Sequence, residues 1–484
     1  MNLLLVASAL LFSAFTVSLA MSKYERLLGV FFIIRSSHGI RLIDAVAKIK
    51  PRLWEFLADF SVLLSFGGVG AFYLSSHKQS RNNTHKAFLV IGLMFTAYAI
   101  LIGRTDVAWM YFLLAVLLAY AMPKLGNPGF DFAFTWAFFS LGFRLQFDSG
   151  TSVIFGLFGL PALMVYLLFT HGMNILASKT NLPGISPMLP AERNGNVGVK
   201  FPGYDIFIPW WHALIALFIT LVAHEGAHGV LVRTAKVNLK STGVLSFLAM
   251  PIGAFVEPDE DELKRKSSVD RMRVFTMGSF ANLTVGFAAA TSIILMLNVL
   301  SSVVYSDGMK VVGFMDGYPA KKVLPQDTVV YAINGKKVAD LESFRNVTAK
   351  MRPGMNVRLN TSNGFYQMRL SRSDNEPKRG ILGVYITNNP RIKGGFIGIE
   401  YLIFILETLG WIAFFNINIA LVNLLPIIPF DGGRMFKEVV TTLKMSEKNM
   451  NRLLYASIGL VAVLFIVNAI PLLKMLLDYV ISLT

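Results

Sequence analysis

The sequence predicts a multi-spanning α-helical membrane protein of about ten transmembrane helices, with a small β-rich module inserted between two of them. Of its 484 residues, 54% are hydrophobic and only 15% are charged, whereas a soluble protein has about 25% charged residues. The mean hydropathy of +0.56 agrees with this class. One region differs, because residues 306–390 have only short apolar runs that alternate with polar residues.

Charge and cysteine content exclude several classes of protein. The net charge is +16, but Lys and Arg stand at the ends of the apolar runs, as the positive-inside rule describes, and not in one solvated cluster. We therefore expect no nucleic-acid partner. The chain has no cysteine, which excludes disulfides, thiolate metal sites and cysteine nucleophiles. Any metal would be held by His and carboxylate side chains.

Residues 1–200 form the first predicted domain, an N-terminal transmembrane region. The apolar segment at 2–20 is interpreted as a membrane anchor, with a cleaved signal as the alternative. Residues 27–34 are apolar but too short to span alone, and the polar segment 174–207 is expected to be a loop. Further spans are expected at 54–75, 87–103, 106–122, 131–147 and 153–173.

The rest of the chain is divided into 201–305, 306–390 and 391–484. Within 201–305 we expect spans at about 208–231 and 274–304, separated by a re-entrant or interfacial element at 243–256. Residues 391–484 hold two more spans, at about 397–422 and 454–477.

The 306–390 module is predicted to contain a hairpin and a helix. The Asn334-Gly335 step between β-rich runs is the hairpin signal, and Leu341–Met351 indicates the helix. Alternation of the spans places the basic clusters in the cytoplasm and this module outside. We expect a multi-pass protein of the cell membrane.

The run at 208–231 contains His224-Glu225-Gly226-Ala227-His228, an HExxH motif. Residues four apart share one helix face, so both imidazoles can bind one metal while Glu225 handles the proton of a metal-bound water. Each ionisable group in a membrane span costs roughly 2.5–3.5 kcal/mol, and a divalent metal would compensate it. The alternative is a chance pattern with histidines satisfied in the core.

A third metal ligand must come from elsewhere, because catalytic zinc usually has three protein ligands and one water. Asp431 is the best candidate. It follows Pro426 and Pro429 and precedes Gly432 at the end of an apolar span, where prolines forbid a plain helix. An ordinary helix stop is the alternative, but the motif at the same inferred depth on the cytoplasmic side favours a ligand.

Gly278 and Asn282 lie four residues apart in the 274–304 span. On one helix face, this pair suits close helix packing together with an interhelical hydrogen bond. Packing without any part in catalysis is the alternative.

These motifs together resemble those of the site-2 proteases, which are intramembrane zinc metalloproteases. The HExxH motif, the Gly278–Asn282 element and the Asn423-x-x-Pro426…Asp431-Gly432 motif occur in the family's order. Residues 251–258 look like the loop that follows the metal helix in archaeal and eukaryotic-type members. The 306–390 module looks like a PDZ domain, a β-rich fold that binds peptide ends or extended strands. The resemblance covers about 208–477.

The resemblance implies a role for each motif residue. His224, His228 and Asp431 would bind Zn²⁺, and Glu225 would act as general base and then as proton donor. Asn423 would be catalytic by orienting or polarising the substrate carbonyl. Substrate binding or structural support would fall to Gly278, Asn282, Pro426, Pro429 and Gly432.

The implied partners are transmembrane protein substrates, the lipid bilayer and a peptide ligand of the PDZ-like module. A substrate helix must unwind locally, because its carbonyls are otherwise hidden in hydrogen bonds. One alternative is a transporter or channel, in which intramembrane His and Asp mark an ion path. That alternative leaves the inserted module unused. An inactive relative is disfavoured because both metal motifs are intact.

Overall fold

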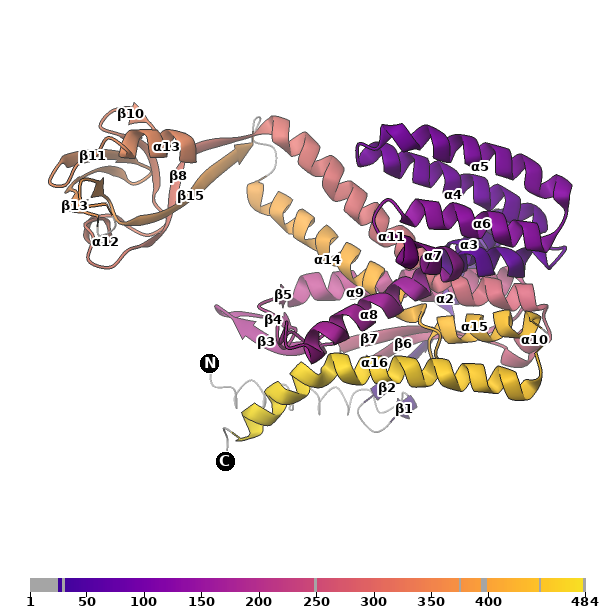
Figure 1. The fold of residues 1–484 in the computed structure, drawn as a ribbon. Coiled ribbons are helices and arrows are strands. Elements are labelled where there is room, and N and C mark those ends of the chain that lie inside the picture. The colour runs from indigo at the N-terminus through magenta and orange to yellow at the C-terminus, as the bar shows by residue number, and fades with distance from the viewer. Residues whose placement is uncertain are drawn as a thin grey trace. The chain divides into compact units, whose positions relative to one another are not determined.

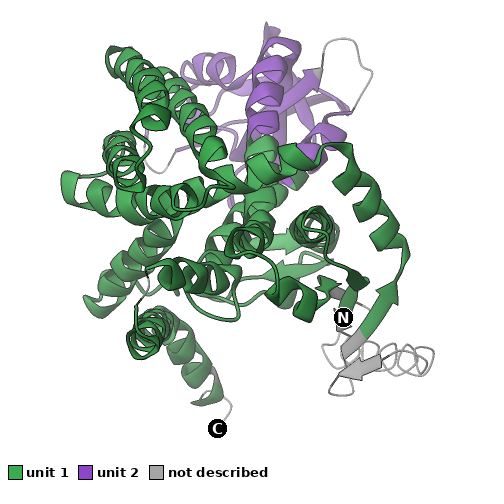
Figure 2. Cartoon of the chain, turned by 90° about the vertical axis from the view of Figure 1, so that its right-hand side faces the viewer, with its two compact units in different colours: residues 1–290, 408–484 green, residues 291–407 purple. Residues whose placement is uncertain are grey.

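The chain forms two compact units in the computed structural model, which describes residues 25–27, 31–247, 250–373, 376–392, 398–443 and 445–481. Unit 1 comprises residues 1–290 and 408–484, and unit 2 comprises residues 291–407, as Figure 2 shows. The predicted module at 306–390 falls within unit 2. The predicted anchor at 2–20 lies outside the described residues.

Seven helices of the described residues are long and apolar enough to cross a membrane. They are labelled in Figure 1: α3 (Pro51–Ser75), α4 (Arg81–Leu101), α5 (Thr105–Leu125), α9 (Trp210–Thr234), α11 (Ser268–Val303), α14 (Ile399–Asn423) and α16 (Glu447–Ile481). The predicted class of helical membrane protein is thus confirmed. The predicted number of about ten spans is not.

Two predicted spans are shorter than expected. The 131–147 span is α6 (Pro128–Phe143), and the 153–173 span is divided into α7 (Ser149–Phe158) and α8 (Leu160–Leu176) by Gly159. Gly159 has a φ of +64°, and a Cβ there would lie 2.2 Å from the Ser65 carbonyl oxygen. The division therefore follows from a close approach to α3, which periodicity within 153–173 does not reveal.

Two segments too short to cross a membrane form a sheet. Strands β1 (Glu25–Leu27), β2 (Phe31–Ser36), β6 (Leu239–Phe247) and β7 (Met250–Pro258) lie in that order and are all antiparallel. Arg35 pairs with Gly243, about 200 residues away in sequence. The element expected at 243–256 is therefore a pair of strands, whose ladder satisfies backbone groups that a short apolar segment would leave bare.

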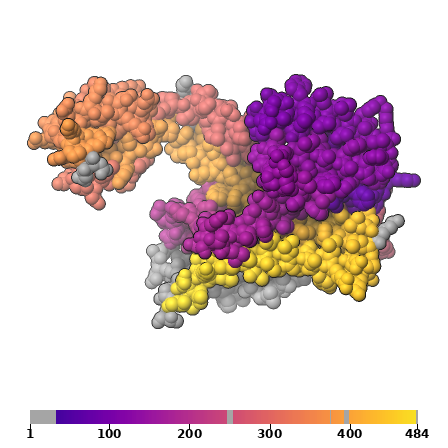
Figure 3. Space-filling view, viewed as in Figure 1, coloured from indigo at the N-terminus to yellow at the C-terminus, as the bar shows by residue number. Residues whose placement is uncertain are grey.

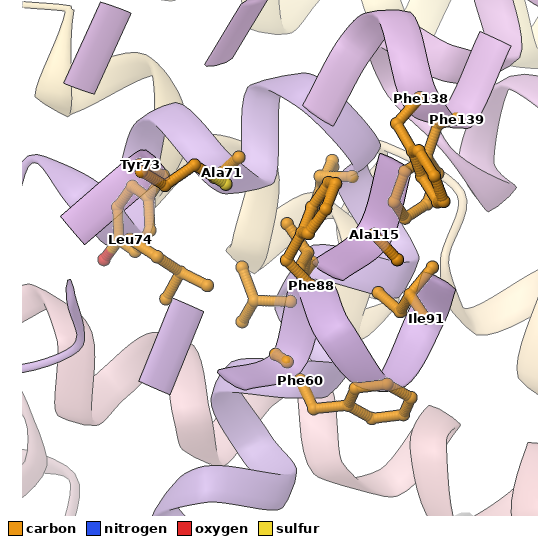
Figure 4. Close-up of a cluster of buried hydrophobic side chains, with 14 of the residues drawn as sticks. Phe60, Ala71, Tyr73, Leu74, Phe88, Ile91, Ala115, Phe138 and Phe139 are labelled. Carbon is orange, nitrogen blue, oxygen red and sulfur yellow. The ribbon is translucent and has the colours of Figure 1, made fainter. Parts of the chain in front are cut away.

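The N-terminal helices pack around an aromatic core. Figure 4 shows Phe88 and Ile91 of α4 close to Phe138 and Phe139 of α6, and the Phe88 and Phe138 rings are 4.9 Å apart. Gly92 lets α4 approach α5, since a Cβ there would lie 2.1 Å from the Ala115 Cβ. Close packing at small residues is typical of membrane helices.

Smaller elements complete unit 1. The predicted loop at 174–207 contains part of a three-stranded sheet of β3 (Leu189–Arg193), β4 (Asn196–Lys200) and β5 (Phe207–Pro209). Short helices are α2 (His38–Ile49), α10 (Glu260–Lys264) and α15 (Asp431–Thr442). Helix α16 adjoins α8, where Asn468 Nδ2 donates to the Leu168 carbonyl at 2.8 Å. The yellow surface of α16 borders the purple N-terminal helices in Figure 3.

Unit 2 contains a mixed α/β module. Its main sheet has the strand order β12-β11-β9-β8-β15, with β10 added to β9. The strands are β8 (Val304–Phe314), β9 (Val329–Ile333), β10 (Lys336–Lys337), β11 (Asn356–Thr361), β12 (Gly364–Arg369) and β15 (Val384–Ile392), and a short pair is formed by β13 (Ser371–Arg372) and β14 (Gly380–Ile381). The helices are α12 (Ala320–Val323) and α13 (Leu341–Thr348).

The hairpin predicted at Asn334-Gly335 is confirmed. These residues join β9 to β10 and have φ values of +49° and +77°, which is the conformation that an Asn-Gly turn provides. The sheet covers a core that includes the fully buried side chains of Met309, Val311 and Leu359.

Candidate metal centre

The histidines of the HExxH motif and Asp431 meet at one point in unit 1. His224 and His228 lie on α9, and Asp431 is the first residue of α15. The two Nε2 atoms are 3.2 Å apart, and Asp431 Oδ2 lies 3.2 Å from His224 Nε2 and 3.0 Å from His228 Nε2. Two imidazoles and a carboxylate, about 200 residues apart in sequence, thus form one group that could hold a metal ion.

The outer ring nitrogens set the chemistry of this group. His228 Nδ1 lies 2.7 Å from the Val274 carbonyl oxygen. A carbonyl can only accept, so Nδ1 carries the proton and Nε2 presents a lone pair. Asn282 Nδ2 lies 3.2 Å from His224 Nδ1, and the Asn282 Oδ1 is buried without a hydrogen-bond partner. Exchanging the amide nitrogen and oxygen would let Oδ1 accept from His224 Nδ1, and His224 Nε2 would then also direct a lone pair inwards.

Three lone-pair-bearing atoms within 3.2 Å repel one another unless a cation lies between them. Zinc binds His and carboxylate ligands at 2.0–2.2 Å, which makes ligand atoms of a tetrahedral site about 3.3 Å apart. The donor set and its spacing fit zinc. Three protein ligands leave one tetrahedral position for water.

Gly278 allows α11 to pass against the two histidines. A Cβ at this position would lie 2.3 Å from His228 Nε2 and 2.7 Å from His224 Nε2. Any larger residue would therefore occupy the space of the ligand atoms. Asn282, one turn further on α11, is fully buried and contacts His224 from the same face. Both residues thus lie against the histidines of the HExxH motif.

Glu225 is held by the sheet. Its Oε2 accepts a hydrogen bond from the Val256 backbone N–H of β7 at 3.0 Å. Strand β7 belongs to the segment that was expected to follow the metal helix. This contact fixes one carboxylate oxygen of Glu225 and leaves the other to exchange a proton.

A cavity of about 380 Å³ brings most of the predicted residues together. Its lining includes the three metal-binding candidates together with Glu225, Asn423 and Pro429. Arg434, which the sequence indicates only as part of a basic cluster, also lines the cavity. Its guanidinium carbon lies 5.7 Å from the centre of the Phe275 ring. Arg434 follows Asp431 by one helical turn, a spacing that could have indicated it.

Of the five predicted support residues, only Pro429 lines this cavity. Pro426 lines a different cavity, and its carbonyl accepts a hydrogen bond from Ser457 Oγ at 2.9 Å. Gly432 is buried against backbone, since a Cβ there would lie 2.3 Å from the Leu424 carbonyl carbon. Both residues shape the turn between α14 and α15.

Buried charges secure the helices around the centre. Arg271 of α11 donates two hydrogen bonds to Glu438 of α15, at 2.7 and 2.8 Å, and Ser268 Oγ donates a third at 2.7 Å. Arg273 donates two to Asp59 of α3, at 2.8 and 2.7 Å. From the sequence alone, Arg271 and Arg273 are only part of the basic cluster at 264–273. Isolated acids in apolar runs, such as Asp59, were the available signal.

Comparison with known proteins covers the same region. Residues 212–467 match the model of "Peptidase family M50". The chain is also 31% identical over 313 residues to "Uncharacterized protein MJ0971" of Methanocaldococcus jannaschii, a match that covers 64% of this chain and 77% of that protein. The match to the family model includes both histidines, Glu225 and Asp431.

Proposed function

Because the chain belongs to peptidase family M50, we propose that it is an intramembrane zinc endopeptidase that cleaves peptide bonds within or near transmembrane helices of membrane-anchored proteins. The observation that carries the proposal is the meeting of His224, His228 and Asp431 beside Glu225 in one cavity among apolar helices. Family membership favours this function over a transporter or channel.

The zinc would be held by the three converging atoms. When bound there, it would polarise the scissile carbonyl and lower the pKa of a bound water to about 7. The Val274 carbonyl fixes the His228 tautomer for this, and Asn282 holds the His224 ring in place.

Glu225 moves the proton. Its carboxylate lies at the cavity with one oxygen fixed by Val256. The free oxygen takes a proton from the attacking water and delivers it to the leaving amide nitrogen. The Asn423 amide, at the same cavity, donates a hydrogen bond to the carbonyl oxygen as negative charge develops on it.

The substrate enters as an extended segment. A helix would hide its carbonyls, so the scissile bond is presented unwound. Strand β7 is an edge strand of the sheet β1-β2-β6-β7 among the described strands. An unpaired strand edge can bind an extended peptide. The non-helical turn with Pro429 lines the same cavity. Both features support an extended substrate beside Glu225.

We assign residues 306–390 as a PDZ-like domain that selects substrates by binding a peptide end or an extended strand. An antiparallel sheet with two short helices supports the assignment. By the distribution of Lys and Arg, the metal centre faces the cytoplasmic side of the cell membrane and this domain lies outside.

The test is cleavage of a model single-span substrate by the purified full chain in lipid nanodiscs. We expect wild-type protein to cut it and Glu225→Gln to lose about 10³-fold or more in rate. Glu400→Gln, an exposed glutamate at the start of α14, is the control and should cut normally. Equal cleavage by wild type and Glu225→Gln would show that the catalytic assignment is wrong.

A further inference from the structure

Unit 1 contains a second cavity, of about 900 Å³, separate from the metal centre. It is bounded by N-terminal helices α3, α6, α7 and α8 and by C-terminal helices α15 and α16. Its walls are mainly aromatic and aliphatic, and none of the described residues that line it is Asp, Glu, Lys, Arg or His. Representative lining residues are Phe72, Phe132, Phe155, Ala162, Val440 and Leu460.

Most of the polar groups in the wall are already hydrogen-bonded. Of the four hydroxyl-bearing side chains in the lining, Tyr73 is hydrogen-bonded to Ser268 at 2.7 Å, Thr151 to Asp148 at 2.5 Å and Thr442 to the Glu438 carbonyl at 3.1 Å. The fourth is Tyr166. A peptide backbone in this cavity would leave its N–H and C=O groups unsatisfied. Water is equally disfavoured, because apolar cavities stay dry.

The volume of the cavity is that of a small-molecule site. It holds about 900 Å³, within the range of about 300–1,000 Å³ that ligand pockets have. Its occupant is therefore small, uncharged and without unmatched hydrogen-bonding groups.

We propose that this cavity is a binding site for a hydrocarbon chain of a bilayer lipid. Such chains surround the helices of a membrane protein and match the uncharged wall in polarity. The cavity also adjoins the segment that carries Asp431. Pro426 and Val440 line it, and they stand on either side of Asp431 in sequence. A bound chain would thus support the turn and the helix that carry this metal-binding candidate from the side away from the metal.

Photolabelling tests the site in wild-type protein. The full chain is placed in phosphatidylcholine nanodiscs containing phosphatidylcholine with a diazirine in its acyl chain, irradiated, and mapped by peptide mass spectrometry. The readout is label on Val439 and Val440 of α15, assigned to the residue by fragmentation of the peptide. Val439 and Val440 are only 5% and 1% exposed, so lipid in the bulk bilayer cannot label them. We expect label there, and its absence in wild type would overturn the proposal.

Variants that fill the cavity provide the second arm. Ala162→Phe on α8 should lower labelling of Val439 and Val440 about fivefold or more by occupying the space. Leu167→Phe is the matched control, because Leu167 lies on the same helix, is 45% exposed and does not line the cavity. It should label like wild type.

A second variant that fills the cavity is tested in case the first does not fold. Val69→Phe acts from α3, and each variant is scored only if its thermal unfolding midpoint stays close to that of wild type. Unchanged labelling in a folded filling variant would overturn the proposal. If neither variant folds, the wild-type result alone decides. No readout depends on cleavage, so this inference and the proposed function fail separately.

Discussion

The two units have exposed ion pairs in common, but among the described residues unit 1 also buries charged pairs. In unit 1 the Arg273–Asp59 pair has side chains only 3% and 0% exposed, and Arg271–Glu438 is mostly buried. In unit 2 the pairs Lys310–Asp327, Lys321–Asp316 and Arg379–Glu376 are all at least 38% exposed on each side. Buried polar contacts specify how unit 1 is assembled, whereas an apolar core does so in unit 2.

The difference follows from the solvent of each unit. Lipid chains are as apolar as a membrane helix, so apolar faces alone do not select one helix partner over another. Polar pairs in unit 1 supply that selection, and the His-His-Asp group, which could hold a metal ion, adds a further polar contact between α9 and α15. Unit 2 can rely on burial of side chains such as Val311 and Leu359. Four predictions test this comparison, from the largest expected effect to the smallest.

Arg273→Met should destabilise the protein by about 3–5 kcal/mol, because it leaves the Asp59 carboxylate buried and unpaired. The measurement is the unfolding free energy of the purified chain in detergent. The double variant Asp59→Leu/Arg273→Met removes both charges and should recover most of the loss. If the single and double variants are equally unstable, the pair does not act as a unit.

Gly278→Ala should weaken zinc binding about 10–100-fold, since the new Cβ would fall within 2.7 Å of both ligand nitrogens. Competition with a zinc indicator measures the affinity. The control is Gly410→Ala on α14, where a Cβ would meet nothing within 4 Å. Unchanged affinity in Gly278→Ala would mean that α11 does not lie against the ligands as described.

Lys310→Met should change stability by less than about 1 kcal/mol, because its partner Asp327 is 67% exposed and already hydrated. The same unfolding measurement applies. A loss comparable to that of Arg273→Met would break the comparison between the units.

Asp340 gives the smallest effect, at the start of α13. Its carboxylate accepts from the Ser343 backbone N–H, which lowers the pKa of Asp340 below its usual 3.8. A lowered folded-state pKa means stability that is present above the unfolded value and is lost as pH falls through the folded value. Protection of α13 amides from hydrogen exchange, taken relative to the intrinsic exchange rate at each pH, should therefore fall below about pH 4. Asp340→Asn should remove this pH dependence, and an unchanged profile would contradict the assignment.

Much of the centre could be predicted from sequence because the chemistry is local. His224 and His228 share a helix face by their spacing, and Asp431 stands out as an acid beside prolines in an apolar span. Gly278 and Asn282 could be assigned to one face. Their contact with His224 could not, because helix rotation depends on packing between distant segments.

The remaining features depend on contacts that sequence patterns do not carry. Strand β2 pairs with β6 across about 200 residues, as Arg35 with Gly243, and each strand alone looks like a short apolar run. The break at Gly159 depends on the approach of Ser65. The residue pattern within one segment shows which secondary structure that segment prefers. Strand pairing and the break at Gly159 are instead set by contact with another segment.

The most direct test of the account is the zinc content of purified variants. Wild type and Glu225→Gln should each hold about one zinc per chain, because Glu225 moves protons and is not a ligand. Asp431→Ala and His224→Ala should each lose it while remaining folded. Full zinc content in Asp431→Ala, or loss in Glu225→Gln, would contradict a centre formed by His224, His228 and Asp431.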